Sequence, residues 1–183
     1  MKAVRICLLA LLAKCSLILA AEVCTELQNE GFKAAVTGYK SCFKIINPTW
    51  PHSGAEKALT DCQNIAKDKD GWKARLAHVA DENTQKLIDQ LISEAGGIKA
   101  TFIGLKINRD DKSNAQLVWE GAEGQETEYM PEDVTPEVME GMPSAFKCVI
   151  TCYPDKCSTG QRYKWQARHC NWPTSAVCEL YKE

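Results

Sequence analysis

The chain has 183 residues, of which 45% are hydrophobic and 25% charged, and this composition is typical of one ordinary globular domain. The formal net charge is −2 and no concentrated basic segment is present, so the sequence gives no reason to expect nucleic acid or an anionic membrane as a partner. Beyond the N-terminus, no stretch is apolar over the length needed to cross a bilayer.

The N-terminus has the pattern of a secretory signal. Lys2 and Arg5 precede an apolar run that ends in small residues, and we predict a signal peptide over residues 1–21, followed by one domain over residues 22–183. The alternative is a membrane anchor, which Lys14 disfavours because it interrupts so short an apolar run. We therefore expect a secreted, extracellular protein.

The cysteines support this location. Cys7 and Cys15 fall in the signal, so eight of the ten cysteines remain in the mature chain. An even count in an oxidising compartment predicts disulfides, although spacing alone does not fix their pairing or the oligomeric state. The eight are Cys24, Cys42, Cys62, Cys148, Cys152, Cys157, Cys170 and Cys178.

Two helices are predicted in the first half of the chain. Ser53 and Glu56 have the spacing of a capping box before a helical apolar stripe that includes Cys62. A second helix is expected after Asp81, its N-cap, and should end at Gly96-Gly97.

Short strands are predicted around the helices. The β-formers fall in residues 41–46, 75–79, 101–105 and 116–119. Gly104 lies inside the third of these strands, where the absence of a side chain allows another backbone to come close.

A long acidic loop follows the last of these strands. No lysine or arginine lies between Lys112 and Lys147, and the segment is rich in proline and glycine. A loop of this length inside a compact domain is usually functional or disordered. Its acidic residues are Glu120, Glu123, Glu126, Glu128, Glu132, Asp133, Glu137 and Glu140.

The order of these features resembles the long form of the C-type lectin-like domain, over essentially the whole mature chain. The resemblance implies an α+β fold in which two helices flank small antiparallel sheets, the first and last strands pair, and a long irregular loop carries the ligand site. The residues that carry it are Cys42-Phe-Lys, Ala58-x-x-x-Cys62, Leu76-Ala-His-Val, Phe102-Ile-Gly-Leu105, Val118-Trp119-Glu-Gly121, Cys148, Trp165 to Cys170 and Val177-Cys178-Glu179.

The resemblance also implies three disulfides, Cys24–Cys42, Cys62–Cys178 and Cys148–Cys170. Two cysteines are left over, and the Pro-Asp turn between them predicts an additional local bridge, Cys152–Cys157. A zinc site built from Cys152, Cys157, His169 and Cys170 is the alternative, which is disfavoured because secreted thiols usually oxidise first.

The chain departs from the family in its calcium motifs. Sugar-binding members hold Ca²⁺ with a Glu-Pro-Asn or Gln-Pro-Asp triplet in the loop and an Asn-Asp pair after the strand tryptophan. Here Gln166 and Ala167 follow Trp165, and no loop proline has the flanking oxygen pair. We therefore predict no metal at the principal site and no cofactor, while Ca²⁺ held by the loop carboxylates in another geometry remains the alternative.

These observations predict a non-catalytic binding protein, since no nucleophile, zinc or phosphate motif is present. The expected partner is a glycan, recognised independently of Ca²⁺ through the loop and the adjoining strand from Arg162 to Arg168. A role in innate immunity is the associated expectation. The alternative is an extracellular protein that the chain binds as a ligand or inhibitor. The candidate binding residues are Glu128, Glu132, Glu137, Glu140, Arg162, Lys164, Gln166 and Arg168, whereas Trp119 and Trp165 are expected in the core.

Overall fold

A computed structural model describes residues 24–34, 41–47, 54–98, 100–109, 115–120, 129–130, 145, 147–152 and 164–182. The predicted signal peptide lies outside these ranges. The described elements are, in order, α2 (Thr25–Gln28), β1 (Lys33–Ala34), β2 (Ser41–Ile46), α3 (Ala55–Ala66), β3 (Lys73–Leu76), α4 (Glu82–Glu94), β4 (Ala100–Arg109), β5 (Ala115–Trp119), β6 (Cys148–Cys152), β7 (Trp165–Arg168) and β8 (Ser175–Tyr181).

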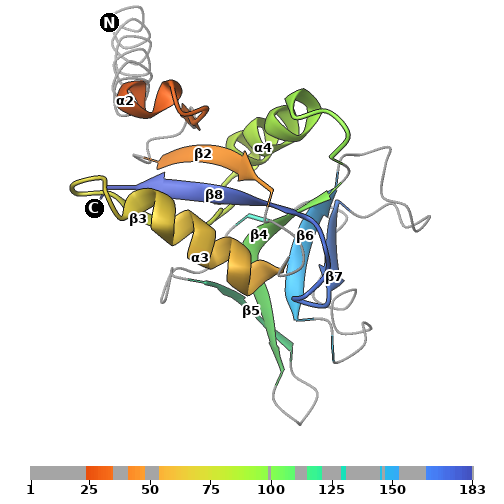
Figure 1. Cartoon of the computed structure of the whole chain (residues 1–183). Helices are drawn as coiled ribbons and strands as arrows, with labels where there is room; N and C mark the ends of the chain where they lie inside the picture. The colour runs from red at the N-terminus through yellow and green to blue at the C-terminus, as the bar shows by residue number, and fades with distance from the viewer. Residues whose placement is uncertain are drawn as a thin grey trace, which may run out of the picture.

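The described strands form one sheet in the order β1-β2-β8-β4-β6-β7, with β3 paired to β8 and β5 paired to β4 (Figure 1). The antiparallel pairing of β2 with β8, with Cys42 opposite Leu180, joins the two ends of the domain. The α+β fold and the paired first and last strands are therefore as the resemblance implied.

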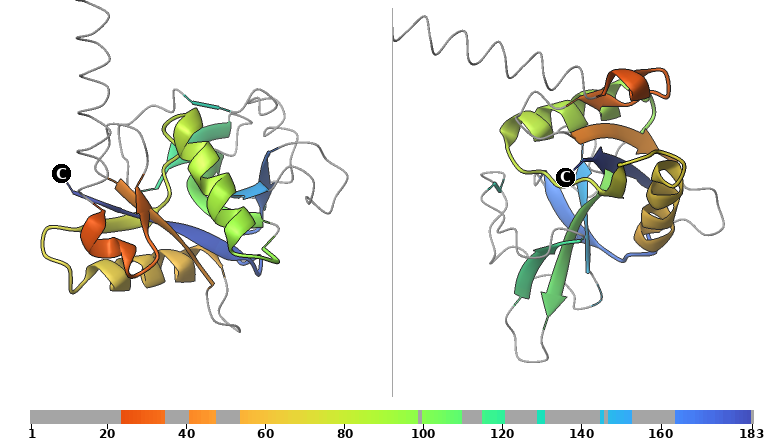
Figure 2. Two further views of the ribbon diagram at one scale, coloured as in Figure 1. Left: turned by 90° about the horizontal axis from the view of Figure 1, so that it is seen from above. Right: turned by 90° about the vertical axis from the view of Figure 1, so that its left-hand side faces the viewer.

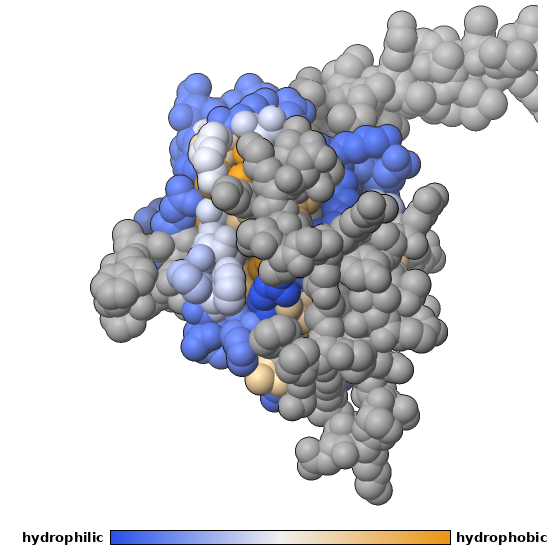
Figure 3. Space-filling model, turned by 90° about the vertical axis from the view of Figure 1, so that its right-hand side faces the viewer, coloured by the Kyte–Doolittle hydropathy of each residue, from blue (hydrophilic) through white to orange (hydrophobic). Residues whose placement is uncertain are grey.

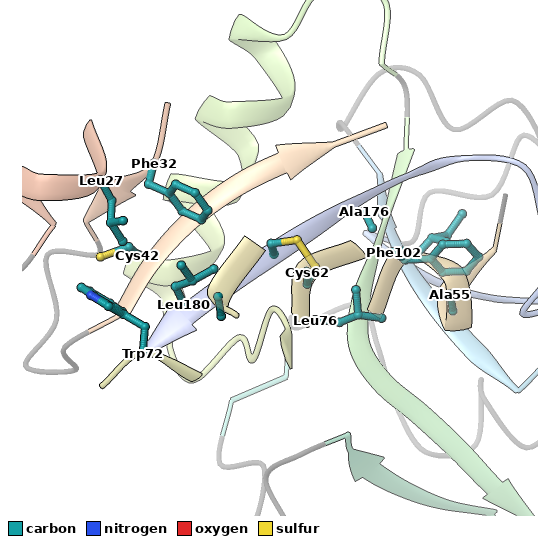
Figure 4. Close-up of a cluster of buried hydrophobic side chains, with 14 of the residues drawn as sticks. Leu27, Phe32, Cys42, Ala55, Cys62, Trp72, Leu76, Phe102, Ala176 and Leu180 are labelled. Atoms are coloured by element: carbon teal, nitrogen blue, oxygen red, sulfur yellow. A yellow bond between two sulfur atoms is a disulfide. The ribbon is translucent and has the colours of Figure 1, made fainter. Parts of the chain in front are cut away.

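The helices α3 and α4 lie on opposite faces of the β2–β8 pair (Figure 2). One hydrophobic cluster, which includes Ile88 of α4 and Val177, fills the α4 side. A second cluster, which includes Ala58 and Cys62 of α3, fills the other side (Figure 4). Because neighbouring residues of β8 point to opposite faces, Val177 and Cys178 fall in different clusters.

Three disulfides tie the elements together, with the pairings that the resemblance implied: Cys24–Cys42, Cys62–Cys178 and Cys148–Cys170. Cys152 is also disulfide-bonded. Its predicted partner, Cys157, lies outside the described residues, so this pairing stays a prediction.

The start of α3 differs from the predicted capping box. Ser53 lies outside the described residues, and the observed N-cap is Gly54, which has no side chain to cap the helix. Instead, the backbone N–H of Ala55 donates to the carbonyl of Cys170 at 2.7 Å. A Cβ at Gly54 would come within 2.8 Å of that carbonyl, so the close approach of the two backbones requires glycine here.

The α4 helix follows its predicted signals. Asp81 is the N-cap, and its carboxylate accepts the backbone N–H of Thr84 at 2.7 Å. Gly96 and Gly97, both with positive φ, follow the helix end. The predicted close approach at Gly104 is also confirmed, since a Cβ there would lie 2.7 Å from the carbonyl oxygen of Leu76.

Other elements differ from their predicted boundaries. The predicted strand over residues 75–79 is observed at Lys73–Leu76, where it pairs with β8, and the short helix α2 was not predicted. α2 has one turn, which is too short to produce a periodic apolar pattern in the sequence.

Candidate functional site

The predicted binding strand is β7, at one edge of the sheet. It pairs only with β6 among the described strands, with Trp165 opposite Thr151 and Arg168 opposite Cys148. The described residues on the side of the molecule where β6 and β7 lie present a mainly hydrophilic surface (Figure 3).

An aromatic cluster lies behind β7. Trp119 and Trp165 are 2% and 0% exposed, which confirms the prediction that both are core residues. Their rings meet edge-on with centroids 5.9 Å apart, and Tyr129 contacts Trp165 in a similar geometry at 6.1 Å. Tyr129 belongs to the acidic loop, so this contact places one residue of the loop against the sheet.

His78 completes the cluster from the other side. Its ring lies 4.7 Å from that of Trp119, and its backbone N–H donates to the buried carboxylate of Glu179 at 2.8 Å. Burial lowers the pKa of the imidazole, an effect that the negative charge of Glu179 opposes and the positive charge of Arg75 reinforces. The neutral ring is therefore the form that packs on Trp119.

A buried hydrogen-bond network connects β7 to α4. The side-chain oxygen of Gln85 accepts the indole N–H of Trp165 at 2.7 Å, and its amide nitrogen donates to Asp89 at 2.9 Å and to Thr151 at 3.2 Å. Gln85 is 1% exposed, so these contacts replace water. The sequence analysis did not select Gln85 or Asp89, although a glutamine beside the apolar stripe of α4 was a usable signal.

The two described cations of the predicted site have partners within the fold. Lys164 forms an ion pair with Asp89 of α4. Arg168 donates to the carbonyl of Ala167 at 2.8 Å and to the side-chain oxygen of Gln166. The guanidinium also lies 5.7 Å from the ring of Trp172, which is 44% exposed.

Partial burial lowers the pKa of the Arg168 guanidinium from its ordinary value. The group nevertheless keeps its charge at neutral pH, because an arginine titrates far above that range. Arg168 and Trp172 thus present a half-buried cation next to an exposed aromatic ring.

The two residues that follow Trp165 show whether Ca²⁺ could bind at the family's principal site. Gln166 is 0% exposed, and its side-chain oxygen accepts a hydrogen bond from Arg168. Ala167 is also buried and has no side-chain oxygen. Since Ca²⁺ requires six to eight oxygen ligands, several of them anionic, a buried amide beside a guanidinium does not fit the ion.

The other predicted binding residues are not among the residues that the structure describes. Glu128, Glu132, Glu137, Glu140 and Arg162 lie outside the described residues, so their placement in a site remains a prediction. At the start of the loop, Glu120 forms an ion pair with Lys106 of β4.

Two features are absent from the described part of the chain. It contains no group of three or more histidine, cysteine, aspartate or glutamate side chains placed to hold a metal ion. None of its helices has the length and apolar character needed to span a membrane.

Comparison with solved structures shows the same fold at low sequence identity. Human lithostathine is 22% identical, with a TM-score of 0.57, 84% of this chain covered and 98% of that one. The C-type lectin CEL-I from Cucumaria echinata is 14% identical, with a TM-score of 0.54, 78% of this chain covered and 91% of that one.

The cow C-type carbohydrate-recognition domain of CD23, determined in the presence of a GlcNAc2Man3 oligosaccharide, is 16% identical, with a TM-score of 0.54 and coverages of 84% and 95%. A comparison with curated protein sequences found no match. The model of the lectin C-type domain family matches residues 52–180. The chain therefore belongs to the C-type lectin domain family.

Proposed function

We propose that this protein is a secreted, non-catalytic lectin that recognises a glycan through the acidic loop and the adjoining residues 164–172, without a calcium ion at the family's principal site. The proposal that no calcium ion binds at the principal site rests on the hydrogen bond that Arg168 donates to Gln166. It directs a positive group to the oxygen that would otherwise face the ion.

In this proposal, Arg168 replaces the ion as the positive group next to the strand. A guanidinium has several N–H donors in one plane and can bind two oxygens of a sugar or a carboxylate at once. Gln166 is buried, so its role is to orient Arg168, while Arg168 and Trp172 contact the ligand.

Secretion is supported by the disulfides. Three bridges link distant parts of the chain, and such bridges persist in oxidising compartments outside the cytosol. Among the structural relatives, the CD23 domain was determined in the presence of an oligosaccharide, which supports a glycan as the partner class.

A second candidate function is protein binding, and Trp172 favours it. This side chain is 44% exposed and lies against Arg168. Tryptophan and arginine are the residue types most enriched where protein–protein interfaces gain their binding energy.

A glycan array probed with the mature protein, once in Ca²⁺ and once in chelator, tests both functions. We expect retention on the same glycans in both conditions. Retention that requires Ca²⁺ would contradict the proposed site, and no retention in either condition would favour protein binding.

Two variants that each remove one positive charge sharpen the test. Arg168→Gln should weaken glycan binding by about tenfold or more, because a hydrogen bond to a charged group contributes about 1.5–3 kcal/mol. Lys86→Gln, on the exposed surface of α4, is the matched control and should bind as the natural chain does.

A further inference from the structure

Arg168 has no counter-charge among the described residues. Its guanidinium donates to two neutral oxygens, the carbonyl of Ala167 at 2.8 Å and the side-chain oxygen of Gln166. None of the ion pairs formed between described residues includes it, whereas the buried Arg75 is paired with Glu179. Water is partly excluded from a charge that no described carboxylate balances, and this costs free energy that a negative group on a ligand would recover.

The geometry of β7 decides which way this cation faces. Neighbouring residues of a strand point to opposite faces of the sheet. Trp165 and Ala167 belong to the hydrophobic cluster on the α4 side, so Gln166 and Arg168 share the other face, where the amide oxygen reaches the guanidinium. The buried Gln166 therefore fixes one edge of the guanidinium. A guanidinium has more N–H groups than its two observed contacts use, so donors remain for a ligand.

The turn that follows β7 is fixed by three contacts. The backbone N–H of Trp172 donates to the carbonyl of His169 at 2.9 Å, and the Cys148–Cys170 disulfide links the turn to β6. The carbonyl of Cys170 also accepts the N–H of Ala55 at the start of α3. The turn that carries the indole is therefore ordered before a ligand arrives, so less conformational entropy is lost on binding.

We propose that the ligand at this place is a glycan whose terminal sugar carries an anionic group, a carboxylate or a sulfate, bound by two N–H groups of Arg168. Planar guanidinium groups bind such oxygen pairs side by side. The indole of Trp172, which is 44% exposed and lies 5.7 Å from the guanidinium, packs against the apolar C–H face of the same sugar. This inference rests on the glycan function proposed above and names the class of glycan.

A single acidic group fits the site better than a densely charged chain. Lys164, the other described cation of the predicted site, is already paired with Asp89. The loop that adjoins the strand in the proposed function is acidic, and its charge disfavours a polyanion. The expected ligand therefore ends in one acidic sugar and is otherwise neutral.

The test is a glycan array of matched pairs, probed in chelator with the mature, disulfide-bonded protein. Each pair presents a glycan that ends in sialic acid, glucuronic acid or sulfated galactose, next to the same glycan without the acidic group. We expect the acidic members to be retained at protein concentrations about tenfold or more below those that the neutral members require, because hydrogen bonds to charged groups are the stronger ones. The pair with the largest difference shows whether the group is a carboxylate or a sulfate.

The outcomes separate this inference from the function on which it rests. Equal retention of acidic and neutral members would overturn the acidic class and leave the glycan function intact. No retention of any glycan, with Ca²⁺ or with chelator, would contradict both.

Variants assign the preference to single residues. Arg168→Gln should reduce retention of the acidic members to that of the neutral ones, and Arg168→Lys, which keeps the charge but not the planar pair of donors, should keep part of the difference. Trp172→Ala should weaken both members of a pair by a similar factor. Lys86→Gln, which removes a positive charge from the exposed surface of α4, should change neither. A full acidic preference in Arg168→Gln would overturn the assignment to this residue.

Discussion

The indole nitrogen of Trp165 in β7 donates a hydrogen bond to the side-chain oxygen of Gln85 in α4, 2.7 Å away, inside the protein. Trp165 also contacts Tyr129 of the acidic loop. The position of α4 is therefore connected to the loop through one amide and two aromatic rings. A glutamine can make this connection because its side chain accepts one hydrogen bond and donates two.

We predict that Gln85→Leu destabilises the fold by about 1–3 kcal/mol, because it leaves the buried N–H of Trp165 without its acceptor. Urea denaturation followed by tryptophan fluorescence measures the change. Gln90→Leu, on the exposed surface of the same helix, is the matched control and should change the free energy of unfolding much less. Equal effects of the two substitutions would show that the buried contact contributes nothing.

Local signals in the sequence predicted α4 well. Its N-cap, Asp81, and its terminating Gly96-Gly97 pair act within a few residues of the helix ends, so a short window contains all the information. Gly104 was predicted from the same kind of signal. The disulfide pairing came from the family resemblance, since spacing alone left it open.

Contacts between distant residues could not be predicted in this way. The first N–H of α3 donates to the carbonyl of Cys170, which is remote in sequence. Lys164 was selected as a ligand contact, and its ion-pair partner, Asp89, became visible only when the fold brought α4 against β7. Polar partners of this kind are a property of the packing, not of the local sequence.

A second buried polar group, the carboxylate of Glu179, lies toward the C-terminal end of β8. Glu179 is 2% exposed and accepts hydrogen bonds from Arg75 at 2.9 and 3.1 Å, from the hydroxyl of Ser41 at 2.7 Å and from the backbone N–H of His78 at 2.8 Å. One carboxylate thus links β2, β3 and β8.

We predict that Glu179→Gln destabilises the fold by about 3 kcal/mol, because it removes the negative charge and leaves the guanidinium of Arg75 buried without it. Thermal and urea denaturation measure the loss. Glu26→Gln breaks an exposed ion pair with Lys182 and should leave the denaturation midpoint unchanged within error. A small effect at Glu179 would mean that its other hydrogen bonds suffice to hold the site.

Two disulfides have a cysteine in the β2–β8 strand pair, and they should contribute differently to the free energy of unfolding. Cys62–Cys178 closes a loop with a sequence separation of 116, whereas the separation is 18 for Cys24–Cys42. On the chain-entropy model these loops correspond to about 5 and about 3 kcal/mol. All four cysteines are fully buried, so the packing lost in the double alanine variants is comparable.

We therefore predict that Cys62→Ala/Cys178→Ala lowers the urea midpoint more than Cys24→Ala/Cys42→Ala. Denaturation of both variants with the other bridges intact gives the comparison. A larger drop in the urea midpoint for Cys24→Ala/Cys42→Ala would show that the conformational entropy gained by the unfolded chain does not follow loop length.

The last prediction concerns acid stability and His78. Burial lowers the pKa of its ring in the folded state, whereas an exposed histidine in the unfolded chain titrates near pH 6.5. The stabilising effect of the neutral ring is complete above that pH. As pH falls below about 6.5 the unfolded chain takes up the proton first, so the free energy of unfolding decreases until the folded ring also titrates.

The groups that face this ring are Glu179, which opposes the shift, and Arg75, which adds to it. His78→Phe keeps an aromatic ring against Trp119 and cannot take up a proton, so its free energy of unfolding should change less between pH 7 and about pH 5 than that of the natural chain. The carboxylates whose pKa is also lowered, including Glu82 and Glu94, titrate below their ordinary value of 4.5 and act in a more acidic range. Identical pH profiles of the two proteins would mean that protonation of His78 does not limit the acid stability of the fold.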